Sequence, residues 1–347
     1  MYTVSLFGSK NSGINITVFG KTDVGRTRDH NEDCFIVADL SRQASSLQPD
    51  VREHHVGSRG TLLLIADGMG GAAAGEIASE MAADVIYQHM ITNWIKDEDE
   101  GPQQFAFRLK EAVELANAKI HQYAQDHPDL RGMGTTTTAV GVLGDQLYLT
   151  QVGDSRAYLV RNGEGIQLTK DQSLMQRLVD AGELTEEEAE QSERRNIILQ
   201  ALGPDPKVRV DLTNQQIREG DAVVLCSDGL SGQITRDEIT QIVAQDDKDL
   251  MQICGDLIEL ANERGGPDNI TVVVARFGGT RLKAASDGDE AGHQVYPLLD
   301  PESTTEPVPI YRESPPPTPE NKAEMIWSGG IAALVTALGL FFSTIGF

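Results

Sequence analysis

Two stretches of this sequence share a pattern in which an apolar run leads directly into an aspartate and a glycine. They are TLLLIADGMGG, residues 61–71, and AVVLCSDGLSG, residues 222–232. Each run has the length and the Val, Ile and Leu content of a buried strand. An Asp-Gly pair is a common turn, but strand ends of this kind can also hold carboxylates around a cation. The rest of the chain has to separate these two interpretations.

The expected strands come in clusters and do not alternate strictly with helices. Residues 142–168 read as a meander with Gly-Asp and Asn-Gly turns. This grouping predicts an α+β fold with antiparallel sheets instead of a doubly wound parallel sheet. The expected strands are 16–23, 34–40, 61–67, 136–143, 146–153, 155–161, 207–213, 222–228 and 270–277. Apolar residues at helical spacing predict helices over 76–95, 103–125, 237–243 and 250–262.

Composition excludes several classes of function. Acidic residues outnumber basic ones by 53 to 29, which gives a formal charge of −24. Such a surface repels phosphate backbones, so no nucleic acid partner is expected. The three cysteines, Cys34, Cys226 and Cys254, show no CxxC spacing. We therefore expect neither disulfides nor zinc, and a reducing compartment fits.

The chain divides into four parts by composition. Residues 1–15 look irregular, and residues 16–279 form the expected folded domain. Residues 280–324 carry Pro, Ser, Thr and charges, including SPPPTPE, and are predicted to be a disordered linker because they offer little apolar area to bury. Residues 325–347 contain no charged side chain. A membrane-spanning helix needs about 20 such residues, so this last segment is predicted to span a membrane.

The predicted membrane helix suggests where the domain lies. The N-terminus lacks a basic start followed by a long apolar core, so no secretion signal is expected, and the folded domain is predicted to remain cytoplasmic at the cell membrane. Gly329, Ala333 and Ala337 repeat at four-residue spacing. Small residues at this spacing let two membrane helices approach closely, but they are also ordinary in single membrane helices, and both interpretations stay open.

Acidic residues recur beside the expected strands, each next to a glycine or another small residue. If they converge, two carboxylates about 4 Å apart repel each other by roughly 1 kcal/mol in water and about 4 kcal/mol at an intermediate dielectric. A single arginine, Arg28, cannot offset several such charges, and no His or Cys cluster accompanies them. Ligand sets made of oxygen alone suit Mg²⁺ or Mn²⁺. The acids that predict this hard-cation site are Glu32, Asp33, Asp67, Asp154, Asp228 and Asp268.

Seven elements in a fixed order carry a resemblance to a known family. They are RTRDHNED (26–33), IADGMGG (65–71), GMGTTTTAV (132–140), QVGDSRAY (151–158), DQSL (171–174), CSDGL (226–230) and PDNITVVV (267–274). Together they resemble the metal-dependent serine/threonine protein phosphatases of type 2C, over about residues 16–277. The resemblance implies a sandwich of two antiparallel sheets flanked by pairs of helices. It also implies hydrolysis of phosphoserine and phosphothreonine on proteins, opposing protein kinases.

The resemblance also implies a site with two Mn²⁺ or Mg²⁺ ions. Asp67 matches the acid that bridges both ions, and Arg28 matches the arginine that holds the substrate phosphate. A metal-activated water attacks phosphorus directly, so no cysteine or threonine is expected as a nucleophile. Arg131 stands where many members have an acid that helps to bind a third ion, so a third ion stays open. The implied ligands are Glu32 (through water), Asp33, Asp67, Gly68, Asp228 and Asp268.

Other residues match supporting elements of the family. Asn269 is expected to support the ligands from behind, and Asp154 with Arg156 matches a structural element. Residues 174–195 match a variable flap beside the cleft. Two other functions remain as alternatives: a catalytically inactive member that binds phosphorylated proteins, and a calcium-stabilised adhesion module on a membrane stalk. Intact ligands argue against the first, and the missing secretion signal argues against the second.

Overall fold

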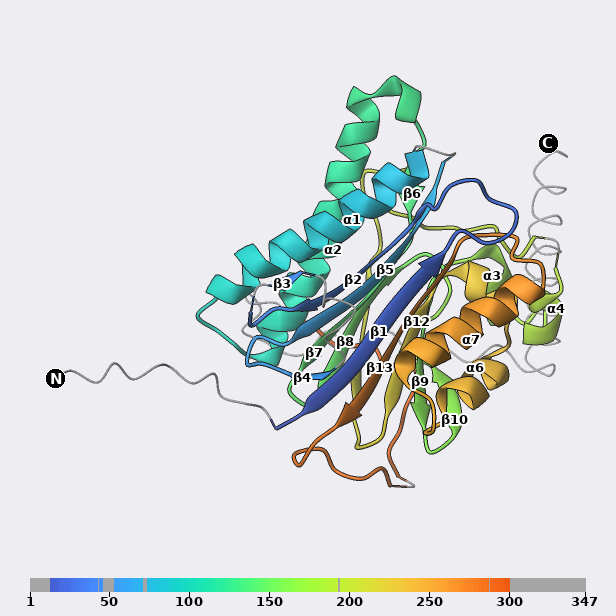
Figure 1. Ribbon diagram of the computed structural model, residues 1–347. Coiled ribbons are helices and arrows are strands. Elements are labelled where there is room, and N and C mark those ends of the chain that lie inside the picture. The colour runs from blue at the N-terminus through green and yellow to red at the C-terminus, as the bar shows by residue number, and fades with distance from the viewer. Residues whose placement is uncertain are drawn as a thin grey trace, which may run out of the picture.

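A computed structural model describes residues 13–42, 44–45, 53–70, 74–192, 194–286 and 288–299. Two sheets pack face to face and helices cover both outer faces (Figure 1). The first sheet, in spatial order, contains β10 (Glu164–Gln167), β9 (Arg156–Arg161), β12 (Ala222–Cys226), β13 (Ile270–Gly278), β1 (Asn15–Asp23) and β4 (Glu53–His55). The second contains β11 (Asp211–Gln216), β8 (Gln146–Val152), β7 (Thr137–Leu143), β5 (Thr61–Met69), β2 (Asp33–Asp39) and β3 (Ala44–Ser45), with β6 (Gly134–Thr135) beside β5.

Neighbouring strands in both sheets pair antiparallel, which confirms the predicted α+β class. Alternate side chains of each sheet point into the space between the sheets and form a buried cluster that includes Ile16, Leu63, Val140 and Val273. The opposite side chains of β5, such as Leu62 and Leu64, pack under helices instead. Both faces of the central strands are therefore buried, which explains their nearly continuous apolar sequence.

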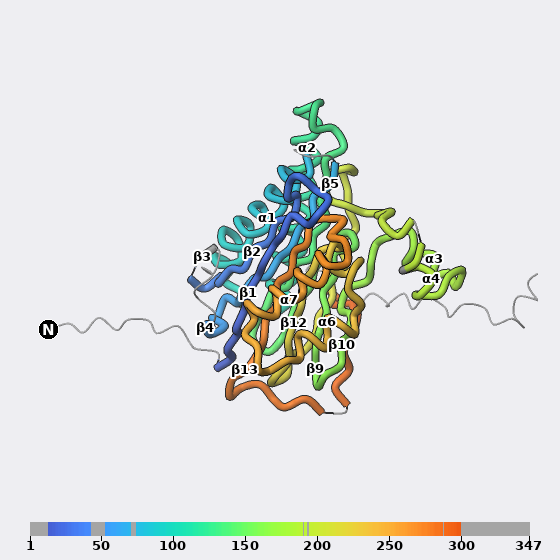
Figure 2. The backbone as a smooth tube through the Cα atoms, turned by 45° about the vertical axis from the view of Figure 1, so that its right-hand side comes forward, coloured from blue at the N-terminus to red at the C-terminus, as the bar shows by residue number. Residues whose placement is uncertain are grey.

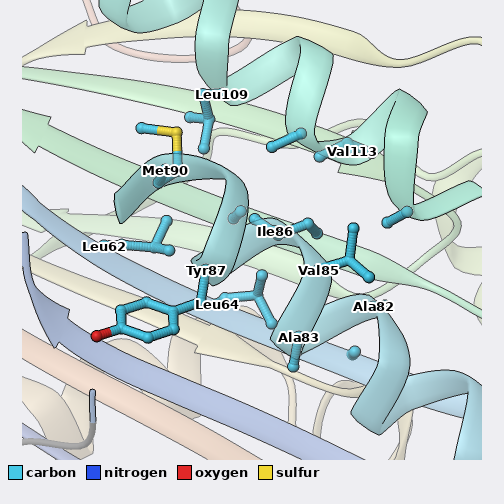
Figure 3. Packing of buried hydrophobic residues seen from close by; sticks show 14 of the residues in the cluster. Leu62, Leu64, Ala82, Ala83, Val85, Ile86, Tyr87, Met90, Leu109 and Val113 are labelled. Atoms are coloured by element: carbon cyan, nitrogen blue, oxygen red, sulfur yellow. The ribbon is translucent and has the colours of Figure 1, made fainter. Parts of the chain in front are cut away.

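Two helix pairs close the sandwich. Helices α1 (Ala74–Thr92) and α2 (Pro102–Asp126) cover the second sheet, where Leu62 and Leu64 meet apolar side chains of both helices (Figure 3). Helices α6 (Arg236–Val243) and α7 (Leu250–Glu263) cover the first sheet. Thr235 and Asp249 begin these two helices with capping boxes, which satisfy amide groups that would otherwise lack partners.

Shorter helices complete the domain. They are η1 (Trp94–Lys96), η2 (Pro128–Leu130), α3 (Leu174–Asp180), α4 (Glu186–Glu190) and α5 (Asp228–Ser231). Helices α3 and α4 lie in the predicted flap and stand out from the body of the domain (Figure 2). The expected strand 207–213 is wrong in its bounds, because only residues from Asp211 onward pair with β8.

The predicted disordered linker is wrong over its first part. Residues 281–286 and 288–299, called the strap below, continue from the end of β13 and pack against the domain. Leu282 is buried in the core between the sheets, and Asp289 forms an ion pair with Arg218. Pairing with the open edge of a sheet supplies backbone partners that composition alone does not reveal.

The predicted membrane helix, residues 325–347, and the rest of the linker lie outside the described residues, as does most of the irregular N-terminus. Within the described residues, no helix combines the length and the apolar character that crossing a bilayer requires.

Candidate metal centre and active site

Two of the predicted ligands lie directly opposite each other on neighbouring strands. In the antiparallel pair of β2 and β5, Asp33 is the register partner of Asp67. The sequence suggested a strand that ends at Asp67. Strand β5 instead runs on to Met69, so Asp67 lies inside the strand. Asp228 is likewise the first residue of α5, two residues beyond the end of β12.

The electrostatics show that the remaining acids converge on this pair. Burial raises the pKa of Asp67 well above its ordinary value, and the charges of Asp33, Asp228, Asp154 and Asp268 raise it further. Burial also raises the pKa of Asp228, with Asp268 as the next contribution, and a hydrogen bond to Asp67 opposes the shift. Carboxylates carried by or next to both sheets therefore share one largely buried region.

The two oxygens of Asp33 show most directly that the carboxylates of this region have too few hydrogen-bond donors. Its Oδ2 accepts hydrogen bonds from Ser227 Oγ at 2.8 Å and from Thr271 Oγ1 at 2.6 Å. Among the described residues, its Oδ1 is buried and has no hydrogen-bond partner, and the same is true of Oδ1 of Asp154. Burial raises the pKa of Asp33 to about 7, with the charges of Asp228 and Asp268 adding to it, although the two hydroxyls lower it. A buried oxygen without a donor is costly, and a cation would satisfy it.

The donor set fits hard divalent cations. All converging groups are oxygens, and burial raises the pKa of Cys34 to about 11 and that of Cys226 to about 12, so neither thiol is a ready ligand or nucleophile. Among the described residues, no three His, Cys, Asp or Glu side chains are already arranged around one ion position. Oδ1 of Asp33 and Oδ1 of Asp154 nevertheless lack hydrogen-bond partners among the described residues, and the oxygen donors present fit Mn²⁺ or Mg²⁺.

Gly68 lies where the backbone itself approaches the site. A Cβ at this position would lie 2.2 Å from the carbonyl oxygen of Gly75 and 2.6 Å from that of Glu32, so only glycine fits. Its amide donates to the Glu32 carbonyl at 3.1 Å. A Cβ on Gly75 would lie 2.4 Å from Oε2 of Glu32, which places that carboxylate against the first turn of α1. Burial raises the pKa of Glu32.

Asn269 connects the loop before β2 to the start of β13. Its Oδ1 accepts from the Glu32 amide at 2.8 Å, and its Nδ2 donates to the carbonyls of Val24 at 3.0 Å and His30 at 2.9 Å. This is the supporting position predicted for it. Arg28, in the same loop, pairs with Asp268 at 2.8 Å and keeps 48% of its side chain exposed. The guanidinium therefore lies at the rim of the acidic region, open to a phosphate.

Sequence reasoning missed the hydroxyl groups that hold the acids. Besides Ser227 and Thr271, Thr136 Oγ1 accepts from the Asp67 amide at 3.1 Å, and Thr135 Oγ1 donates to the Asp67 carbonyl at 2.9 Å. The sequence predicted a strand from residue 136 onward, but Thr136 lies between β6 and β7. The available signal was a hydroxyl residue close to an acid, directly before it in CSDG and three residues after it in PDNIT.

The GDSR element has the two roles its residues suggest. The guanidinium of Arg156 binds Asp171, with contacts at 2.7 and 3.0 Å to Oδ2 and at 3.1 Å to Oδ1. It therefore acts structurally, as expected. Asp154 is buried beside Asp228, and its pKa is raised to about 8, mainly by burial and then by the charges of Asp228 and Asp171. Asp154 thus belongs to the carboxylate cluster itself.

The family model for protein phosphatase 2C matches residues 41–271 of this chain. The chain belongs to this family. The chain is 42% identical over 236 residues to the serine/threonine protein phosphatase PstP of Mycobacterium tuberculosis, a match that covers 66% of this chain but only 44% of that protein. It is 38% identical over 254 residues to the protein phosphatase PhpP of Streptococcus pneumoniae, covering 73% of this chain and 94% of the relative.

Solved structures of the protein phosphatase 2C family agree with this placement. The catalytic domain of PstP in complex with two manganese ions is similar with a TM-score of 0.62 at 36% identity, over 76% of this chain and 99% of that chain. The predicted family and the double-sheet architecture are therefore confirmed. The relatives support two divalent ions per domain, in agreement with the oxygen donors described above.

Proposed function

We propose that this chain removes phosphate from phosphoserine and phosphothreonine on proteins, using two Mn²⁺ or Mg²⁺ ions held by its acidic cluster. The observation that carries the proposal is the pair of Asp33 and Asp67 on neighbouring strands, with a buried Asp33 oxygen that has no partner. The proposed ligands are Glu32 through water, Asp33, Asp67, the Gly68 carbonyl, Asp228 and Asp268. When bound, such ions lower the pKa of a water toward neutrality and stabilise charge on phosphate oxygens.

The chain's own residues orient the reacting groups. Arg28 can hold two phosphate oxygens once it leaves Asp268, because a guanidinium presents paired donors. Ser227 and Thr271 fix Oδ2 of Asp33, so its Oδ1 keeps one direction. Asn269 fixes the loop that carries Glu32 and Arg28. These groups need little rearrangement during the reaction, which is how preorganised sites lower a barrier.

Substrates and location belong to the same proposal. The expected partners are phosphorylated proteins that serine/threonine kinases produce. We further propose that residues 325–347 anchor the chain in the cell membrane, with the domain on the cytoplasmic side, because this segment is uncharged and long enough to span a bilayer. Its three small residues at four-residue spacing are compatible with self-association of that helix.

A phosphothreonine-peptide assay on the full-length chain tests the proposed reaction. We expect hydrolysis that requires added Mn²⁺ or Mg²⁺ and stops with a chelator, and calorimetry should show uptake of two ions. Peptide binding without turnover in saturating Mn²⁺ would instead indicate the inactive binding protein. Fractionation of cells, with protease treatment from outside, tests the anchor and the side on which the domain lies.

A further inference from the structure

The strap extends the second sheet at its open edge. The amide of Asn214 in β11 donates to the Gln294 carbonyl at 3.0 Å, and the amide of Tyr296 donates to the Leu212 carbonyl at 3.0 Å. Between them, Thr213 and Val295 form an antiparallel bridge. Residues 293–299 alternate strictly between exposed and partly buried side chains. This segment therefore behaves as an additional short strand that covers the backbone of β11.

Side chains hold the strap in this register. The Tyr296 ring lies edge-to-face on Tyr148 of β8, with centroids 5.2 Å apart, and Tyr148 meets Phe105 of α2 in the same way at 5.5 Å. The side chain of Gln103 donates to the Pro297 carbonyl at 3.1 Å and accepts from the Leu299 amide at 3.2 Å. The strap thus joins an edge strand to the first turn of α2, and it does so after the family match has ended at residue 271.

The strand that the strap covers pairs with β8, so that Asp211 lies opposite Gln151, and it is also connected to the acidic cluster through the buried side chain of Gln172. Gln172, 7% exposed, donates from Nε2 to Oδ2 of Asp211 at 2.9 Å and to the Arg209 carbonyl at 3.3 Å. Its Oε1 accepts from the Gly153 amide at 3.0 Å, and its own amide donates to the Gly153 carbonyl at 2.9 Å. Gly153 immediately precedes Asp154.

We propose that the strap is a positioning element for the active site. By pairing with β11 it fixes Asp211, and through Gln172 it fixes the loop that presents Asp154 to the other carboxylates. Gln172 is the positioning residue in this connection. The effect on catalysis rests on the proposed phosphatase function, whereas the mechanical connection does not.

Neighbouring strap residues provide a matched pair of variants. Tyr296→Ala removes the ring that packs on Tyr148, while Val295→Ala shortens a side chain that is 69% exposed. In the full-length, metal-free chain we expect Tyr296→Ala to speed hydrogen exchange in residues 211–216 and also in residues 153–156, which lie beyond the part of β8 that pairs with β11. Val295→Ala should leave both segments unchanged. With Mn²⁺, Tyr296→Ala should lower kcat/KM for a phosphothreonine peptide by about tenfold, within the range of couplings measured through packed networks.

Gln172→Ala tests the connection itself. It should speed exchange in residues 153–156 while leaving the strap protected, and adding Tyr296→Ala should lower kcat/KM no further, because the proposed connection from the strap to Asp154 runs through Gln172. Faster exchange at 211–216 without any change at 153–156 would overturn the proposal. If Tyr296→Ala leaves the strap protected, the double variant Gln103→Ala/Tyr296→Ala makes the same comparison. A wild-type chain without Mn²⁺-dependent turnover would refute the proposed function, while the exchange data would still decide the connection.

Discussion

Strand β12 is flanked by two aspartates in opposite environments, the buried Asp221 before it and the partly buried Asp228 after it. Asp221, before the strand, accepts from Arg161 at 2.9 and 2.7 Å and from the Arg218 amide at 2.7 Å. Asp228, after the strand, lies among other carboxylates, and its pKa is raised by burial and by Asp268. One acid is fully paired within the chain, and the other needs a partner from outside. Asp221 stabilises the fold, whereas Asp228 is available to bind a cation.

The contrast predicts opposite responses to neutralisation. Asp221→Ala should destabilise the metal-free chain by about 3–5 kcal/mol, because it leaves the buried Arg161 charge without its partner. Urea denaturation with a chelator measures the change. A loss below about 1 kcal/mol would mean that the Asp221 end is not the structural one.

In the acidic cluster that contains Asp228, neutralising a carboxylate should lower activity without lowering stability. Asp67→Asn should lower kcat/KM by at least about 100-fold, since even changes behind metal ligands cost 10- to 100-fold. The same variant should unfold at equal or higher urea concentration than wild type without metal, because it removes a buried charge repelled by Asp33 and Asp228. A variant that loses stability and activity together would contradict the comparison.

A smaller effect is expected from the hydroxyls behind the ligands. Thr271→Val removes the hydrogen bond to Oδ2 of Asp33 and should weaken Mn²⁺ binding by about tenfold, measured by calorimetry. Thr150→Val is the control, because its buried hydroxyl has no hydrogen-bond partner among the described residues and its strand partners are the apolar residues Ala139 and Leu212. Equal loss of affinity in both variants would show that Thr271 does not orient Asp33.

The pH dependence of stability sharpens the contrast further. In the metal-free chain the pKa is raised to about 7 for Asp33 and to about 8 for Asp154, above the ordinary 3.8. The folded state therefore binds more protons than the unfolded state between about pH 4 and 8, and stability should fall as pH rises through that range. We expect a drop of about 1 kcal/mol or more, seen as about 2–4 °C in Tm. Saturating Mn²⁺ should abolish the decline, and an unchanged slope would contradict the assignment.

The sequence predicted the strands well because they carry apolar runs of strand length, and their grouping into hairpins indicated antiparallel pairing, while the two-sheet sandwich followed from the family resemblance. It also identified the acids, since Asp67 and Asp228 each follow such a run. It could not predict that the strap pairs with β11, because residues 293–299 gain their stability from an edge far away in the sequence. Nor could it find the role of Thr271, whose hydroxyl matters only once Asp33 lies beside it.

The register between β2 and β5 has a consequence for how such a site can arise during folding. Side chains alternate along a strand, so a slip of one residue between these two strands would turn Asp33 away from Asp67. It would also exchange Leu62 and Leu64, which pack under the helices, with Leu63, which packs between the sheets. The packing of apolar side chains on the two faces of β5 therefore also determines which acids lie opposite each other. Ion binding should therefore follow assembly of the sandwich, and a chain with misaligned strands would lose both its apolar packing and its metal site.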